Sequence, residues 1–365
     1  MSIWNRQRLC PPPVGETRMR RGVLCGLFLV LLIFAGSFAH AIAQERYTVN
    51  RPIRSSQDVL PVAPYHTSAV DWETDSDYAM ERAKIASRRL LIYLYTDQDS
   101  PTLLETTHET YVQKGNARFR QLTEVMPSEQ VPLPIASACR EFDTVVLDDP
   151  LVRSSLDWYV LLKLPMNAKV TAEDGSETPI TSLPGFEHMA GHPGLVMIDF
   201  ASRDTPYYGQ VTGILPFWRG VCPTAEQTEI FLNLPPGTLT QRTLTYAVRI
   251  HPDKPLSSNG EALPLIGQVA TKHALYQAET GVMGHQNFGT RSHNVVEALG
   301  GGMPSEICAE SWSDESMFEG AIGCMRAWRN SSAHWAIARK NHRFYGYDMA
   351  KGKNGAWFAV GFFID

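Results

Sequence analysis

The chain reads Ala327-Trp328-Arg329-Asn330-Ser331-Ser332-Ala333-His334-Trp335 near its C-terminus. This stretch and two earlier segments jointly predict the fold of the last third of the chain. The earlier segments are Met283-Gly284-His285 and Cys308-Ala309-Glu310-Ser311. Two imidazoles and a carboxylate, from His285, His334 and Glu310, are the groups that bind a divalent metal or exchange protons. Their spacing is too wide for one helix, so only a tertiary fold can bring them together.

The segments around these residues predict a small α/β unit. The pattern favours helices over Gly267–Thr280 and Ser316–Asn330, and a short helix or strand over Leu239–Ile250. Near the end of the chain, Phe344–Asp348 and Asn354–Phe362 indicate a closing hairpin. The aromatic residues of its second strand alternate with Ala and Gly, which is typical of a buried core strand.

The order of these segments resembles the CAP superfamily, the SCP-like or PR-1-like domains, and in particular its bacterial branch. The resemblance covers residues 239–365 and implies an α-β-α sandwich with a cleft lined by two His and two Glu. It also implies that the two imidazoles, here His285 and His334, bind a divalent cation such as zinc. By position, Glu310 is the first acid of the cleft and the candidate catalytic residue.

The expected second acid is missing from this sequence. In the family it follows the Trp of the next helix, but Trp328 is followed by Arg329 and Asn330. Glu319, earlier on that helix, is only a weak substitute. The incomplete set argues against strong metal binding, because catalytic zinc sites commonly have three protein ligands. His273, His293 and His342 are the alternative imidazoles.

The middle of the chain predicts a separate α/β layer. A capped helix within Trp72–Arg89 precedes the apolar run Leu90–Tyr95, which reads as a central strand covered on both faces. Further strands are expected at Trp158–Leu164, Leu195–Phe200 and, at an edge, Tyr207–Val211, with a loop over 171–187.

Residues 71–232 resemble the thioredoxin fold, with Pro193 where that family places its cis-proline. The redox motif Cys-x-x-Cys is absent, since Asp97-Gln98-Asp99-Ser100 follows the first central strand. Dithiol exchange needs a thiolate and a resolving thiol, so this domain is expected to be redox-inactive. Asn233-Leu234-Pro235-Pro236-Gly237 marks the boundary, and residues 233–238 are the predicted linker.

Composition places the chain among globular proteins, with 44% hydrophobic and 19% charged residues. The whole chain has a net charge of −5 and residues 1–43 carry +4, so the remainder carries −9. An acidic chain without a run of Lys or Arg argues against nucleic acid as a partner.

The N-terminus predicts export. Met19-Arg20-Arg21 is a basic region, Val23–Phe34 is apolar, and Ala41-Ile42-Ala43 is a cleavage site, so residues 1–43 read as a signal peptide. Alternatively, the apolar run stays uncleaved and anchors the chain to a membrane. Residues 44–70 are polar and proline-containing, and are expected to be an exposed lead-in.

Four cysteines remain after cleavage, and an even count in an exported protein suggests disulfides. The favoured pairs are Cys139–Cys222 and Cys308–Cys324, one within each domain, and the alternative is buried free thiols. An oxidoreductase using Cys139 or Cys222 is the weakest hypothesis, because neither lies in a redox motif.

Two functions follow from the sequence. The first is an exported, two-domain binding or interaction protein whose cleft holds a cation or a protein, peptide, lipid or glycan ligand. The alternative is a metal-assisted, peptidase-like hydrolase in which His285 and His334 hold the ion and Glu310 activates water.

Overall fold

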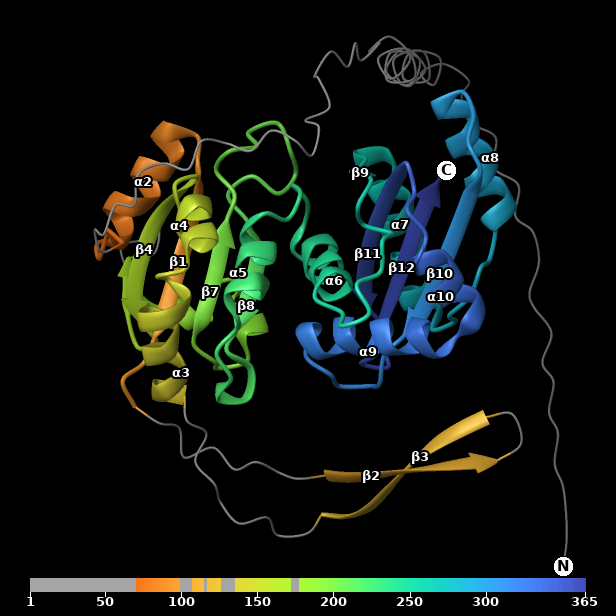
Figure 1. The fold of residues 1–365 in the computed structure, drawn as a ribbon, viewed down its shortest axis with the longest axis horizontal. Coiled ribbons are helices and arrows are strands. Elements are labelled where there is room, and N and C mark those ends of the chain that lie inside the picture. The colour runs from red at the N-terminus through yellow and green to blue at the C-terminus, as the bar shows by residue number, and fades with distance from the viewer. Residues whose placement is uncertain (1–69, 99–106, 115–116, 126–134, 172–176) are drawn as a thin grey trace, which may run out of the picture. The chain divides into compact units, whose positions relative to one another are not determined.

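The computed structural model of the protein describes residues 70–98, 107–114, 117–125, 135–171 and 177–365 (Figure 1). The chain is an α/β protein with two four-stranded mixed sheets packed with helices. The predicted signal at residues 1–43 and the lead-in up to residue 69 lie outside the described residues. In the described part, no helix is both long and apolar enough to cross a membrane.

The first sheet is built around β1 (Arg89–Tyr95) and has the order β4-β1-β7-β8. β4 (Tyr159–Pro165) pairs with β1 in parallel, and β7 (Gly194–Ile198) pairs with it in the antiparallel direction. β8 (Val211–Pro216) is the antiparallel edge strand. Five consecutive residues of β1 are buried because helices and loops cover both faces, which explains its unbroken apolar sequence.

Helix α2 (Ser76–Ala86) lies on one face of this sheet. Asp75 begins it by accepting hydrogen bonds from the backbone of Asp77 and Tyr78, and Ala79 and Ala83 pack in the core. The other face is covered by α3 (Ile135–Glu141), the π-helical turn η1 (Phe142–Val146), α4 (Pro150–Leu156) and α5 (Ala225–Leu232). Two hairpins and three 3₁₀ turns complete the region: β2 (Thr107–Lys114) with β3 (Ala117–Val125), β5 (Lys169–Thr171) with β6 (Glu177–Pro179), and η2 (Ile180–Ser182), η3 (Phe186–Met189) and η4 (Trp218–Gly220).

The second sheet has the order β10-β12-β11-β9. β10 (Pro304–Glu310), β12 (Trp357–Ile364) and β11 (Phe344–Lys351) are antiparallel, and the short β9 (Glu261–Ala262) runs parallel to β11. Alternate residues of a strand point to opposite faces. The β12 residues that face α7 and α8 therefore differ from those that face α6, α9 and α10.

Two helical layers enclose this sheet (Figure 1). On one face, α7 (Pro264–Thr280) packs its alanines on Phe358 and Val360, and α8 (Phe288–Leu299) packs Val295 near Phe362. On the other face lie α6 (Leu239–Arg249), α9 (Met317–Asn330) and α10 (Ser332–Ala338). Helix α7 lies very close to β11: a Cβ on Gly346 would lie 2.4 Å from the backbone nitrogen of Gly267, so only glycine fits there.

Helix α6 contacts both sheets, and its Arg242 is 2% exposed. The Arg242 guanidinium donates to the carbonyls of Leu234 (2.8 Å) and Pro235 (2.7 Å) and lies 3.1 Å from Met197 Sδ of β7. Burial, with a smaller contribution from Arg89, lowers the pKa of Arg242 to about 10, so it remains charged at neutral pH. The predicted linker is thus hydrogen-bonded to a buried arginine, within one compact unit that includes all described residues.

Most predicted elements are present with shifted ends. The helices expected at 72–89, 267–280 and 316–330 correspond to α2, α7 and α9, and the closing hairpin to β11 and β12. The edge strand expected at Tyr207–Val211 instead runs from Val211 to Pro216, because Tyr207–Gln210 form a turn bonded to the Asp199 backbone. The expected loop at 171–187 includes strand β6, and α8, which follows His285, was not among the predicted elements.

The predicted disulfides are not formed, and Cys139, Cys222, Cys308 and Cys324 are free thiols. Cys308 packs with α7, whereas its β10 neighbours Ile307 and Ala309 pack with Cys324 of α9. The sheet itself therefore separates Cys308 from Cys324. Cys139 and Cys222 belong to one core cluster, and burial raises the pKa of both thiols, that of Cys222 to about 12.

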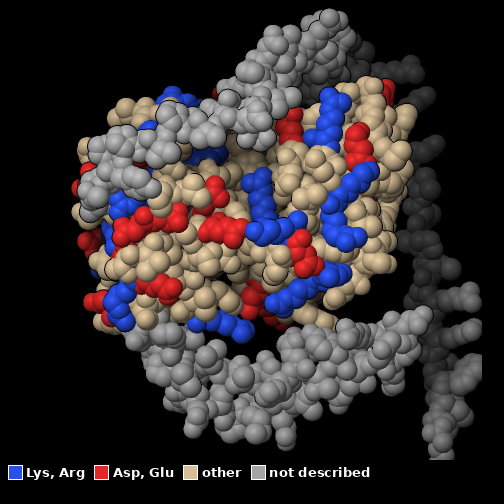
Figure 2. All heavy atoms as spheres, viewed as in Figure 1, with Lys and Arg blue, Asp and Glu red and all other residues tan. Residues whose placement is uncertain are grey.

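Charged side chains of both signs are interspersed on the face shown in Figure 2. On that face, the acidic net charge is not gathered into one patch.

Replacing Arg242 with Ala should lower the free energy of unfolding by about 3–5 kcal/mol, because the Leu234 and Pro235 carbonyls lose charged donors and a cavity remains. Urea unfolding followed by circular dichroism measures the change. Lys272→Ala, which removes an exposed charge on α7, is the control and should change stability by less than about 0.5 kcal/mol. Equal stability of Arg242→Ala and the wild type would contradict the assigned role.

The four thiols should resist iodoacetamide at neutral pH in the native protein, because burial keeps them protonated and the thiolate is the reactive form. All four should be alkylated after unfolding in urea without reductant, as read by peptide mass spectrometry at each position. Alkylation that requires prior reduction would instead show that bridges exist.

Candidate functional site

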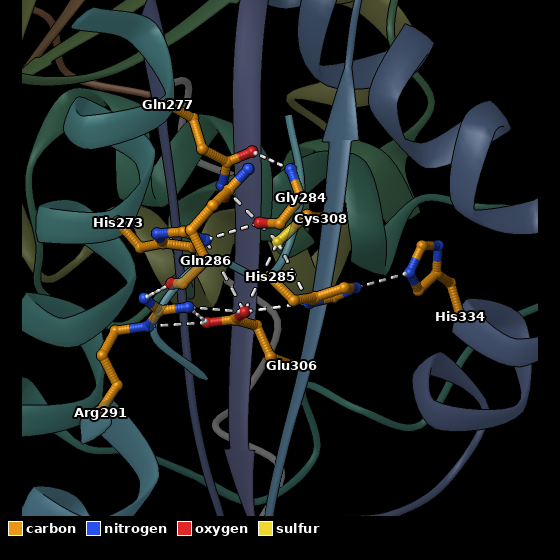
Figure 3. A network of polar contacts seen from close by, with 9 residues as sticks. All are labelled: His273, Gln277, Gly284, His285, Gln286, Arg291, Glu306, Cys308 and His334. Atoms are coloured by element: carbon orange, nitrogen blue, oxygen red, sulfur yellow. Dashed lines mark hydrogen bonds and ion pairs between the residues drawn. The ribbon is translucent and has the colours of Figure 1, made fainter. Parts of the chain in front are cut away.

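His285 and His334 meet at the edge of the second sheet although they are 49 positions apart in the sequence. The Nε2 atoms of the two rings are 3.3 Å apart (Figure 3). His285 lies in the loop between α7 and α8, and His334 lies on α10. The His285 side chain is 44% exposed, so solvent reaches the pair. Burial, and secondarily His285, lowers the pKa of His334 from its ordinary value of 6.5, which favours a neutral imidazole at pH 7.

Glu306 of β10 fixes the orientation of His285. Its Oε1 lies 3.0 Å from His285 Nδ1, and its side chain is 1% exposed. A carboxylate opposite Nδ1 favours the tautomer with the proton on Nδ1. The Nε2 lone pair of His285 then points toward His334.

Arg291 of α8 neutralises the buried Glu306. Arg291 Nη2 lies 2.8 Å from both carboxylate oxygens, Nε lies 3.1 Å from Oε2, and Nη1 donates to the Gln286 carbonyl. Such forked pairs are the strongest carboxylate contacts available to a side chain. Helix α8 begins after Asn287, which has a left-handed backbone, so the turn that follows His285 also positions Arg291.

Two polar residues of α7 hold the loop that carries His285. The Nε2 of His273 lies 2.7 Å from the Gly284 carbonyl, and the Gly284 amide donates to Gln277 Oε1 at 3.2 Å. Gly284 has a φ of 153°, and a Cβ there would lie 3.0 Å from the Gln286 amide. Burial lowers the pKa of His273, so its neutral ring donates to the carbonyl.

Cys308 completes the buried side of the network in Figure 3. Its Sγ lies 3.7 Å from His285 Nδ1 and 3.8 Å from Glu306 Oε1, and Gln277 Nε2 donates to it at 3.6 Å. Burial, together with the nearby Glu306 charge, raises the pKa of Cys308, which keeps the thiol protonated. Among the described residues, His273, Glu306 and Cys308 form a group whose ligand atoms lie within 4.8 Å of one another and could hold a metal ion.

The structure brings together two of the three residues singled out in the sequence. Glu310 lies at the exposed end of β10, where its Oε1 accepts a hydrogen bond from Asn354 at 3.1 Å. The acid in contact with His285 is Glu306. Glu319 caps its own helix by accepting from Ser316.

The alternative histidines have different surroundings. His273 belongs to the buried network, whereas His293 is 78% exposed and faces Glu297 on α8. His342 is buried, lies 2.6 Å from Asp365 and stacks on Phe363.

Sequence reasoning missed Glu306 and Arg291. One signal was the alternation of Glu306, Cys308 and Glu310, which places all three on one face of a strand. An acid on a buried face requires a partner of opposite charge. The spacing of Phe288, Ser292, Val295 and Leu299 was a second signal, since it marks one face of a helix.

No protein-family model matches the chain, and no similar protein was found among the curated proteins.

Glu306→Gln should lower the free energy of unfolding by about 3–5 kcal/mol, because Arg291 loses its counterion in a buried position. Urea unfolding measures this change. Adding Arg291→Met to Glu306→Gln should recover part of the loss, since no unpaired charge then remains. Glu297→Gln, an exposed acid on α8, is the matched control and should change stability by less than about 0.5 kcal/mol. Full stability of the single Glu306→Gln variant would argue against the ion pair.

Proposed function

We propose that this protein is an exported binding or interaction protein whose C-terminal, CAP-like half holds zinc or another divalent cation between His285 and His334. The observation that carries the proposal is the 3.3 Å separation of the two Nε2 atoms. Zinc binds imidazole nitrogens at 2.0–2.1 Å, and a tetrahedral angle between two such bonds places the nitrogens about 3.3 Å apart. The observed separation therefore matches the spacing that zinc requires of two imidazole nitrogens.

The surroundings of His285 support the same assignment. Metal-binding histidines commonly donate their second ring nitrogen to a carboxylate, which fixes the tautomer and increases basicity. Glu306 occupies that position at 3.0 Å from Nδ1. Two imidazoles leave two positions of a tetrahedral ion open, and these positions suit oxygen or nitrogen donors of a protein, peptide or glycan ligand.

The buried group His273, Glu306 and Cys308 is a weaker site for the ion. Arg291 contacts both Glu306 oxygens, and the His273 Nε2 already lies 2.7 Å from a carbonyl. The Cys308 thiol must also lose its proton to bind a metal, which its raised pKa opposes. These contacts favour a supporting role for the buried group.

Metal-assisted hydrolysis remains the second candidate, and the exposure of His285 favours it because substrate and water can reach an ion there. The geometry supports it less well than binding. Catalytic zinc sites commonly have three protein ligands, and Glu306, next to His285, is engaged by Arg291. Glu310, the candidate base, contacts Asn354.

We further propose that residues 71–232 form a redox-inactive thioredoxin-like domain and residues 239–365 a CAP-like α-β-α sandwich. The order β4-β1-β7-β8, with one parallel and two antiparallel pairings, supports the first assignment. Helical layers on both faces of the antiparallel strands β10, β12 and β11 support the second. The raised pKa values of Cys139 and Cys222 agree with the absence of thiol chemistry.

Calorimetric titration of zinc into the protein should show saturable binding of one ion per chain. His285→Ala and His334→Ala should each weaken binding by at least about 100-fold, because losing a ligand costs more than losing a supporting residue, which costs about 10–100-fold. His293→Ala removes an exposed histidine of α8 and should bind zinc as the wild type does.

Saturable binding that survives both His285→Ala and His334→Ala would place the ion elsewhere and refute the proposed site. If zinc binds as expected, esterase and peptidase substrates distinguish the two candidate functions. Turnover that disappears in both histidine variants would favour the hydrolase.

A further inference from the structure

A second polar site lies where α9 gives way to α10. A cavity of about 440 Å³ there, broadly open to solvent, is lined by Arg329, Asn330, Ser332, Trp335 and Arg339. This volume falls within the range of small-molecule sites. Neither His285 nor His334 lines the cavity, although His334 belongs to the same helix as Trp335.

Arg329 is held in place at the cavity by two neighbours. Its guanidinium carbon lies 5.1 Å from the ring centroid of Trp335, and its Nε is paired with Asp253. Trp335 is 6% exposed and packs against His251, with ring centroids 5.1 Å apart. The aromatic ring is thus a fixed support that orders the guanidinium in advance of binding.

Arg339 adds a second positive charge to the cavity. In the described part of the chain, its guanidinium has no ion-pair partner, whereas Lys340 pairs with Asp365 and Arg343 lies over the Phe344 ring. Residues 326–343 include five Arg or Lys and no Asp or Glu. The cavity therefore combines one ordered arginine and one unpaired arginine.

We infer that this cavity binds the oxyanion group, phosphate or carboxylate, of a small ligand. Guanidinium groups present planar forks of N–H donors that match both oxyanions. Asn330 and Ser332 add neutral donors at the cavity wall, and the volume leaves room for a polar portion such as a sugar ring. This assignment goes beyond the cation site and does not depend on it.

Calorimetric titration with glucose 6-phosphate, glucuronate and inorganic phosphate tests the inference, with glucose as the uncharged control. At least one anion should bind saturably and glucose should not. Arg329→Gln and Arg339→Gln should each weaken that binding by at least about tenfold, because a hydrogen bond to a charged group contributes about 1.5–3 kcal/mol. Arg326→Gln, on α9 but outside the cavity, should bind as the wild type does.

Thermal unfolding of each variant establishes that it is folded before its affinity is interpreted. Absence of saturable binding for all three anions would overturn the inference, and so would wild-type affinity in both Arg329→Gln and Arg339→Gln. Arg339→Gln should keep the zinc affinity of the wild type. The anion titrations therefore test this inference, and the zinc titration separately tests the proposed cation site.

Discussion

The buried carboxylate of Glu306 is the constraint on which the C-terminal half depends. A charge that is 1% exposed is stable only if it is paired and hydrogen-bonded. Arg291 supplies the countercharge from α8, and His285 supplies a further contact from the preceding loop. One side chain of β10 thereby sets the positions of a helix, a loop and the imidazole that faces His334.

Arg242 is a second buried charge, and it fixes the segment between the two sheets by hydrogen bonds and not by an ion pair. Its contacts are backbone carbonyls and a sulfur atom, and its Nε has no hydrogen-bond partner among the described residues. Burial opposes the charge and lowers the pKa, yet the hydrogen bonds to Leu234 and Pro235 offset part of that cost. The segment that connects the two sheets is consequently part of the core.

The two proposed sites differ in how their charge is organised. At the cation site, Glu306 lies behind His285 and is paired with Arg291, so it orients the imidazole and adds no net negative charge. At the anion site, the Trp335 ring supports Arg329, whereas Arg339 has no ion-pair partner among the described residues. Both sites involve α10, whose seven residues carry His334 and Trp335.

The sequence alone predicted the central strands, the capped helix within Trp72–Arg89 and the closing hairpin, because apolar periodicity and capping residues act over a few neighbours, and it singled out His285 and His334 as candidates. Only the tertiary structure decided that Glu306 and not Glu310 contacts His285, and that Cys308 and Cys324 lie on opposite faces of a sheet. Glu306 and Glu310 lie on the same face of β10, so the alternation of the strand does not tell which of the two acids contacts His285. What distinguishes them is burial beside Arg291, an interaction between α8 and β10 that arises only when the two elements pack together.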